Sequence, residues 1–236
     1  MKILALETSA KSVSAAVAEN GKILCSNYQN IGLTHSRTLM PLVQGMLSAA
    51  EMTLNDMDAI AVANGPGSFT GLRIGISAVK GLAWAAEKPC CGVSTLLAMA
   101  QNVLHVDGTV ICAMDARRNQ IYNAVFRARN GLLSRVCEDR AISLAQLASE
   151  LKNDENGKII VGDGASLCYN YLSEAGISCR MAPAALVMQN AVGVALAAEE
   201  LICEGKTVSA QDLQPVYLRL SQAERERLAK GLSITV

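Results

Sequence analysis

Residues 58–95 read DAIAVANGPGSFTGLRIGISAVKGLAWAAEKPCCGVST, and this stretch decides the fold more than any other. A short apolar run at 59–63 breaks into a glycine-rich loop, and a helical pattern follows until Pro89. Backbone N–H groups at such a strand-to-helix turn can face an anion, but the same glycines also let a helix pack closely on a sheet. No Lys follows Gly71 as in a P-loop, and Thr70 stands where the last glycine of GxGxxG belongs. Both interpretations stay open.

The composition is that of a globular chain without the usual features of a nucleic-acid-binding or membrane protein. Its 236 residues are 51% hydrophobic, enough for one large domain or two small lobes. Lys plus Arg and Asp plus Glu are 21 each, and aromatic residues are 3%, so we expect no strong binding of nucleic acid by the chain alone. The eight cysteines show no metal-ligand spacing, and no apolar run reaches the ~18 residues of a membrane span. We therefore predict a cytoplasmic protein without a membrane partner.

The first half has the pattern of three strands followed by alternating helices and strands. Asn20-Gly21 is a strong hairpin signal between two β-rich runs. Apolar residues at helical spacing then predict a helix before the glycine-rich segment. The predicted strands are 2–9, 12–19, 22–28, 59–63 and one through Gly92 and Val93, and the predicted helices are 35–52, 72–87 and one from Thr95.

The second half repeats this order. Asn130-Gly131 marks a second hairpin, and Ser143 with Gln146 has the spacing of a helix capping box. The predicted strands are 109–114, 120–128, 132–137, 158–161 and 177–181, and the predicted helices are one after Ser143, one at 165–174 and one at 185–203. The repeated layout predicts an α/β protein of two similar lobes, each a mixed sheet flanked by helices, with a cleft between them.

Ligands are expected in this cleft, outside the carboxyl ends of the strands. The first lobe is predicted at 1–104 and the smaller second lobe at 105–218, with the helix from about 185 packing back on the first lobe and a charged tail at 219–236. Each acid at a strand end fits a solvated turn on its own, but four converging loops favour a site. The candidate nucleotide- or anion-binding residues are Glu7, Thr8, Ser9, Gly65, Gly67, Ser68, Thr70, Gly71, Asp115, Arg117 and Arg118.

Several motifs make the chain similar to one family. They are LALETS at 4–9, THSRTLMPLV at 34–43, GPGSFTGLRIG at 65–75, GVSTL at 92–96, MDARR at 114–118 and PVYLR at 215–219. With these motifs the chain resembles the bacterial TsaB (YeaZ) family of tRNA threonylcarbamoyladenosine biosynthesis proteins. The resemblance is close over 1–104 and mainly one of layout between about 132 and 202. It implies that both lobes have the actin-like (RNase H-like) ATPase fold shared with sugar kinases and heat-shock chaperones.

The resemblance implies a partner role rather than catalysis. TsaB-like proteins pair with TsaD, a catalytic paralogue of the same fold, and support threonylcarbamoyl transfer to an anticodon-loop adenosine of tRNA. That paralogue carries a metal-binding histidine pair in GVNHLEGH, where this chain reads GVSTLLAM at 92–99, with Thr95 and Met99 at the ligand positions. Neither a hydroxyl nor a thioether replaces imidazole usefully. We therefore expect no metal, no cofactor of the chain's own and no catalytic residue.

The resemblance also implies further components of a complex. These are a TsaE-like ATPase, ATP or ADP bound at the level of the complex, and tRNA that is contacted only through the complex. A homodimer is expected when the chain is alone.

The predicted partner surface lies on the first two helices of the first lobe. Small residues at helical spacing in the second of them leave one face low enough for another helix, although this face could equally pack inside its own lobe. The resemblance favours packing of this face against a helix of a partner. The predicted interface residues are Leu39, Val43, Arg73, Gly75, Ala78 and Leu82.

The alternative function is a free-standing nucleotide hydrolase or phosphotransferase of the same superfold. Such enzymes need carboxylates for Mg²⁺ and phosphate loops from both lobes. The run Glu7-Thr8-Ser9 is a partial version of such a loop, whereas Arg117 and Arg118 replace glycines in the second lobe. An arginine pair can hold an anion but obstructs close backbone wrapping, and both arginines also fit the interpretation of ordinary surface charges.

Overall fold

The computed structural model describes residues 1–117 and 119–219. The first part of the chain forms β1 (Lys2–Glu7), β2 (Val13–Glu19), β3 (Lys22–Gln29), α1 (His35–Ala49), η1 (Leu54–Asp56), β4 (Ala59–Gly65), α2 (Phe69–Ala86), β5 (Cys90–Ser94) and α3 (Thr95–Gln101). The second part forms β6 (Gly108–Asp115), β7 (Gln120–Arg129), β8 (Leu132–Arg135), β9 (Arg140–Ser143), α4 (Leu144–Leu151), β10 (Lys158–Val161), α5 (Ala165–Glu174), β11 (Arg180–Met181) and α6 (Ala191–Cys203).

The two sheets repeat one topology. The first has the order β3-β2-β1-β4-β5 and the second the order β11-β10-β6-β7-β8, with β9 added on β7. In each sheet the central strand is antiparallel to the strand that follows it and parallel to the next one, β4 or β10. Both predicted hairpins are present, and their Asn-Gly residues all have positive φ, as a tight two-residue turn requires. The predicted duplication and mixed α/β class are confirmed.

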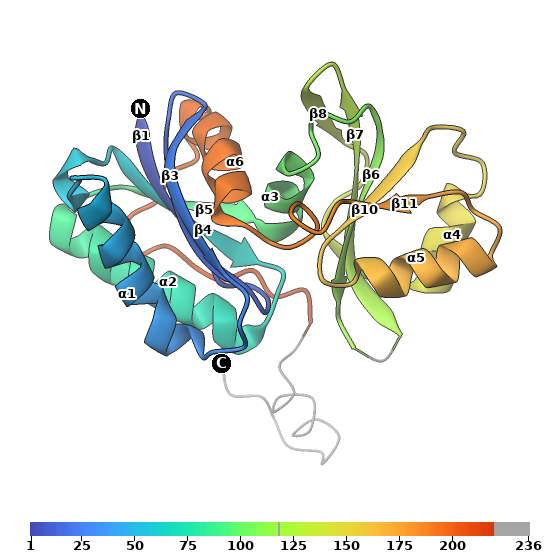
Figure 1. The fold of residues 1–236 in the computed structure, drawn as a ribbon, viewed down its shortest axis with the longest axis horizontal. Coiled ribbons are helices and arrows are strands. Elements are labelled where there is room, and N and C mark those ends of the chain that lie inside the picture. Colours follow the sequence, from blue (N-terminus) through green and yellow to red (C-terminus); the bar gives the residue numbers. More distant parts are fainter. Residues whose placement is uncertain (118, 220–236) are drawn as a thin grey trace, which may run out of the picture.

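The helices divide the molecule into layers (Figure 1). Helices α1 and α2 cover the outer face of the first sheet, and α4 and α5 cover the outer face of the second. Between the sheets lie α3 and α6, which pack against each other, and α6 also packs on β1 and β2. Within residues 1–117 and 119–219, we find no helix that combines the length and hydrophobicity needed to cross a membrane.

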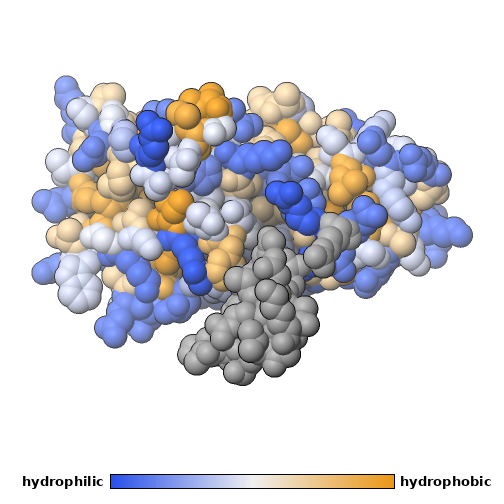
Figure 2. Space-filling model, turned by 90° about the horizontal axis from the view of Figure 1, so that it is seen from below, coloured by the Kyte–Doolittle hydropathy of each residue, from blue (hydrophilic) through white to orange (hydrophobic). Residues whose placement is uncertain are grey.

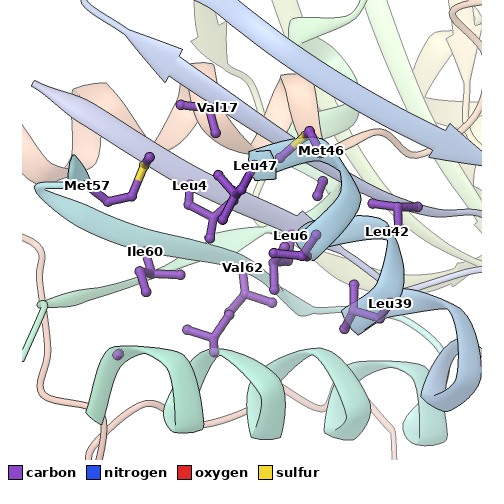
Figure 3. Packing of buried hydrophobic residues seen from close by; sticks show 14 of the residues in the cluster. Leu4, Leu6, Val17, Leu39, Leu42, Met46, Leu47, Met57, Ile60 and Val62 are labelled. Atoms are coloured by element: carbon purple, nitrogen blue, oxygen red, sulfur yellow. The ribbon is translucent and has the colours of Figure 1, made fainter. Parts of the chain in front are cut away.

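Apolar side chains from α1, α2 and the first sheet form one of the cores (Figure 3). The sheet contributes Leu4, Leu6 and Val62, which point toward the helical layer where Leu39 and Leu42 of α1 lie. Both α1 residues are buried, which follows from the helical spacing that predicted this face. This packing fixes the two helices on the sheet and so determines which of their residues face outward.

Some predicted boundaries were wrong. Helix α6 begins at Ala191 rather than near 185, because the Asn190 side chain accepts a hydrogen bond from Val192 N (2.9 Å) and caps the helix there. The preceding residues form turns, whose carbonyl groups at 186 and 188 accept hydrogen bonds from the Asn102 side chain of α3. The predicted strand 177–181 is shortened to β11, α2 begins at Phe69 instead of 72, and β9 was not predicted.

A C-terminal strap, residues 207–219, returns along the first lobe. Val208 and Cys90 exchange two backbone hydrogen bonds of 2.9 Å, so the strap covers the free edge of β5. Further along, Val216 N donates to Asn64 O at the end of β4 (2.7 Å). The strap thereby reaches the glycine-rich loop.

We predict that Ser143→Ala destabilises α4. The Ser143 hydroxyl accepts a hydrogen bond from Gln146 N (3.2 Å), and a helix of only 8 residues depends strongly on such a cap. The free energy of unfolding should fall by about 1 kcal/mol, measured by urea denaturation. Ser143→Thr keeps the hydroxyl and should lose less; equal losses in both variants would contradict a capping role.

Candidate functional site

An interlobe cleft of about 490 Å³ opens where β1, β4 and β6 end. Five predicted residues line it: Ser9, Gly67, Ser68, Asp115 and Arg117. They come from three loops that are far apart in the sequence, so the structure brings together the loops that the strand-end argument placed side by side. Arg118 was predicted to join them, but it lies outside the described residues.

The glycines of the loop after β4 serve contacts within the chain. A Cβ atom on Gly67 would lie 2.6 Å from Ser9 O, and one on Gly65 would lie 2.2 Å from Val216 O of the strap. Ser68 N already donates to Ser9 O (2.7 Å), and the Ser68 side chain accepts from Gly71 N to cap α2. These contacts account for the glycines without a phosphate ligand, which removes the main argument for anion binding from the loop sequence.

The rest of the predicted set is distributed behind and beside the cleft. Thr8 is buried, and its hydroxyl donates to Gly71 O (2.8 Å), so this pair joins β1 to α2. Thr70 lies on the opposite side of the α2 N-terminus and lines a groove between α1 and α2.

Glu7, which is hydrogen-bonded to the cleft residue Ser9, lies behind the cleft lining, here called the floor of the cleft, and is fully buried. Its Oε1 accepts a hydrogen bond from Ser9 N (2.5 Å). Burial raises the pKa of Glu7 to about 7, because the hydrogen bond that it accepts from Ser9 N compensates only part of the lost hydration, and the nearby Asp163 carboxylate raises it further. The floor of the cleft therefore carries an acid that titrates near neutral pH.

Two further residues belong to this floor: Asp163, whose loop was one of the four predicted to converge but which was not among the candidate binding residues, and Gln189, which was not predicted. Asp163, from the loop after β10, lines the cleft, and Gln189 Nε2 donates to its Oδ1 (2.8 Å). Burial also raises the pKa of Asp163 above its usual value, although the Gln189 hydrogen bond lowers it. The Gly162-Asp163-Gly164 run was a detectable signal for Asp163, whereas nothing in the local sequence marked Gln189.

The strap closes one side of the cleft. Tyr217 stacks on Phe69 with ring centroids 4.1 Å apart, and Arg73 lies over the Phe69 ring and donates to the Tyr217 hydroxyl (3.0 Å). Arg219 donates to Ala116 O of the second lobe (2.6 Å). The PVYLR motif contains both strap residues, yet its sequence alone does not show which loop they contact.

Between α1 and α2 lies a second, shallower groove of about 560 Å³. Arg73 and Ala78 line it, and Leu39 forms part of its base. On the lower face of the molecule, hydrophobic side chains gather in separate small groups among hydrophilic ones (Figure 2). Interfaces between folded partners are on average no more apolar than the rest of the surface, so this mixed character does not by itself mark one.

The structure corrects part of the predicted interface. A Cβ atom on Gly75 would lie 2.3 Å from Thr8 Oγ1, so the small-residue face of α2 at Gly71 and Gly75 packs inside its own lobe. Val43 is also buried in the core, and Leu82 is partly buried against it. Of the six predicted interface residues, only those that line the groove remain available to a partner.

Thr95 and Met99 lie on the first turns of α3 and are buried between the lobes. Met99 belongs to the core formed with the second sheet, next to Leu96 and Val110. A search of residues 1–117 and 119–219 finds no group of three His, Cys, Asp or Glu side chains that could hold a metal ion.

Comparisons with known proteins match the chain to TsaB and to its paralogue TsaD. The family description "TsaD: tRNA N6-adenosine threonylcarbamoyltransferase" matches residues 29–227. The chain is 33% identical over 231 residues to the tRNA threonylcarbamoyladenosine biosynthesis protein TsaB of Bacillus subtilis, covering 95% of this chain and 96% of that protein. It is 34% identical over 223 residues to the protein of the same name from Escherichia coli, covering 93% and 95%.

Solved structures give the same result. YeaZ from Pseudomonas aeruginosa superposes with a TM-score of 0.78 at 29% identity, covering 92% of this chain and 99% of that one. Component A of (R)-2-hydroxyglutaryl-CoA dehydratase from Acidaminococcus fermentans shares only the fold, with a TM-score of 0.51, 13% identity and coverages of 86% and 99%. The predicted actin-like superfold is confirmed by these neighbours. From its sequence relatives and its structural neighbours, the chain belongs to the TsaB family of tRNA threonylcarbamoyladenosine biosynthesis proteins.

Proposed function

We propose that this chain acts in the cytoplasm in tRNA threonylcarbamoyladenosine biosynthesis, as a non-catalytic subunit that binds and activates a TsaD-like threonylcarbamoyltransferase. The observation that carries the proposal is the identity and burial of two residues in α3. Where the resemblance places metal-binding histidines in the transferase, this chain has Thr95 and Met99, both buried and Met99 packed in the core. Both positions are buried between the lobes. A thioether is also a poor ligand for a hard or borderline metal.

The partner surface in this proposal is the groove between α1 and α2. It is open to solvent, and it combines aliphatic side chains such as Met40 and Ile74 with the Arg73 guanidinium. In the same proposal the chain forms a homodimer when alone, tRNA is reached only through the complex, and a TsaE-like ATPase with ATP or ADP acts at the level of the complex.

A reconstitution tests the function. The chain, a TsaD-like transferase and a TsaE-like ATPase from the same organism are assayed separately and together with tRNA, threonylcarbamoyl adenylate and ATP, and modified adenosine is measured by mass spectrometry. The chain alone should give no modified tRNA, and its addition should raise the yield of the transferase. Modification by the isolated chain, or no effect of adding it, would overturn the proposal.

Ala78→Arg should weaken association with the transferase at least about tenfold, which corresponds to about 1.4 kcal/mol. Ala78 lines the groove and is only half-buried, so the arginine adds bulk and charge to the surface without entering the core. Binding is measured by sedimentation velocity or calorimetry. Ala145→Arg, on the exposed face of α4 in the other lobe, is the matched control and should bind normally. Equal affinity of both variants would place the interface elsewhere.

A further inference from the structure

The floor of the interlobe cleft is a buried polar cluster that the proposed partner role does not use. It consists of Glu7, Ser9, Asp163 and Gln189, of which Glu7, Ser9 and Gln189 are 0% exposed. Two hydrogen bonds organise it, from Ser9 N to Glu7 Oε1 (2.5 Å) and from Gln189 Nε2 to Asp163 Oδ1 (2.8 Å). The backbone is fixed as well, because Ser12 Oγ donates to Gln189 O (2.9 Å). The cluster is thus held in place by both lobes.

Three polar atoms of the cluster accept no hydrogen bond from any described residue. They are Glu7 Oε2, Ser9 Oγ and Gln189 Oε1. The orientation of the Gln189 amide is determined by Asp163, since the reverse orientation would set an oxygen against a carboxylate. Its Oε1 is therefore an open acceptor beside Asp163. Buried polar atoms are normally satisfied, so three open ones in a single cluster indicate a missing donor or cation.

The negative charges around the cluster also indicate a missing cation. Asp163 raises the pKa of Glu7, and Asp115 raises the pKa of Asp163, so each of these two carboxyls has a second carboxyl close enough to repel it. Lys11 lowers the pKa of Asp163, but this lysine is exposed at the cleft wall and compensates only partly. A fully buried Glu7 carboxyl and a partly buried Asp163 carboxyl, with only the exposed Lys11 shown to compensate among the described side chains, are expensive to ionise.

We propose that Glu7, Ser9, Asp163 and Gln189 form a binding site for a hard divalent cation, with Mg²⁺ as the occupant. The open atoms are carboxylate, hydroxyl and amide oxygens, which are ligands that such ions prefer. Ser9 and Asp163 line the cleft, so an ion can enter from solvent and keep part of its water shell there, as Mg²⁺ does in proteins. Glu7 and Gln189 stand directly behind these two residues through the hydrogen bonds given above.

Thermal unfolding at pH 8 tests the site without reference to any partner. The full chain is compared in MgCl₂ and in choline chloride of equal ionic strength, and Mn²⁺ binding is counted by equilibrium dialysis. We expect one Mn²⁺ per chain and a midpoint of unfolding that is several degrees higher in MgCl₂. Glu7→Gln should abolish both effects, while Glu174→Gln, on an exposed position of α5, should keep them.

Other results would overturn the proposal. No gain from MgCl₂, or an equal gain in the Glu7→Gln variant, would exclude an ion at these residues. An equal gain from KCl would show a monovalent ion or a non-specific salt effect instead. If Arg118→Gln lowers the midpoint in choline chloride and MgCl₂ does not raise that of the unsubstituted chain, then the compensating charge comes from the protein.

Discussion

Gly75→Leu is expected to lower the free energy of unfolding by about 3 kcal/mol, the upper end of the usual overpacking cost. Gly75 lies in α2 above β1, and a Cβ atom there would meet Thr8 Oγ1 at 2.3 Å and Val62 Cγ2 at 3.3 Å. Thr8 cannot move away freely, because its hydroxyl donates to Gly71 O in the same helix. A leucine at position 75 therefore has to push α2 off the sheet. Urea denaturation followed by circular dichroism measures the loss.

Gly81→Leu is the matched control in the same helix. Nothing lies within 4 Å of a Cβ atom at Gly81, and the position is exposed. Because glycine disfavours a helix interior by about 1 kcal/mol relative to the best helix formers, leucine here should leave stability unchanged or raise it slightly. If Gly75→Leu stayed as stable as this control but failed to bind the transferase, Gly75 would belong to a partner interface after all.

The pair Gly75 and Ala78 shows where sequence reasoning stops. Helical spacing correctly predicted that α2 has a small-residue face, but a helix with apolar side chains on several faces does not reveal which of them meets its own sheet. The decision depends on Thr8, which lies far away in the sequence and whose hydroxyl needs the space that glycine leaves. How closely α2 approaches the strands beneath Gly75 is set by the tertiary structure and not by helical periodicity.

Local signals predicted local structure well. The two Asn-Gly hairpins, the strand–glycine loop–helix order and the duplicated lobes are all present, because each is specified by neighbouring residues. The strap was missed because distant groups determine it, whereas the start of α6 was missed although its Asn190 cap is local. Asn102 of α3 holds the chain before α6, and Asn64 and Cys90 hold the strap. The same holds for Gln189, whose role depends on Asp163, 26 residues earlier in the chain.

The second large predicted effect is that the free energy of unfolding depends on pH through Glu7, the acid at the floor of the cleft. Burial raises the pKa of Glu7 to about 7 from its ordinary value of 4.5. Between pH 4.5 and 7 the folded chain holds a proton at Glu7 that the unfolded chain has released. Raising the pH through this interval therefore destabilises the fold, and the full cost is reached above pH 7. The difference between the two pKa values corresponds to about 3 kcal/mol.

Glu7→Gln removes this titration while keeping the shape of the side chain. The amide oxygen still accepts from Ser9 N, and the amide N–H groups gain a use as donors to the open oxygen atoms nearby. In metal-free buffer the variant should match the unsubstituted chain near pH 4.5 and exceed its free energy of unfolding by up to about 3 kcal/mol at pH 8. Urea denaturation across this pH range measures the difference. Glu174→Gln should show no such pH-dependent gain, and a constant difference for Glu7→Gln from pH 4.5 to 8 would mean that Glu7 keeps an ordinary pKa in the folded chain.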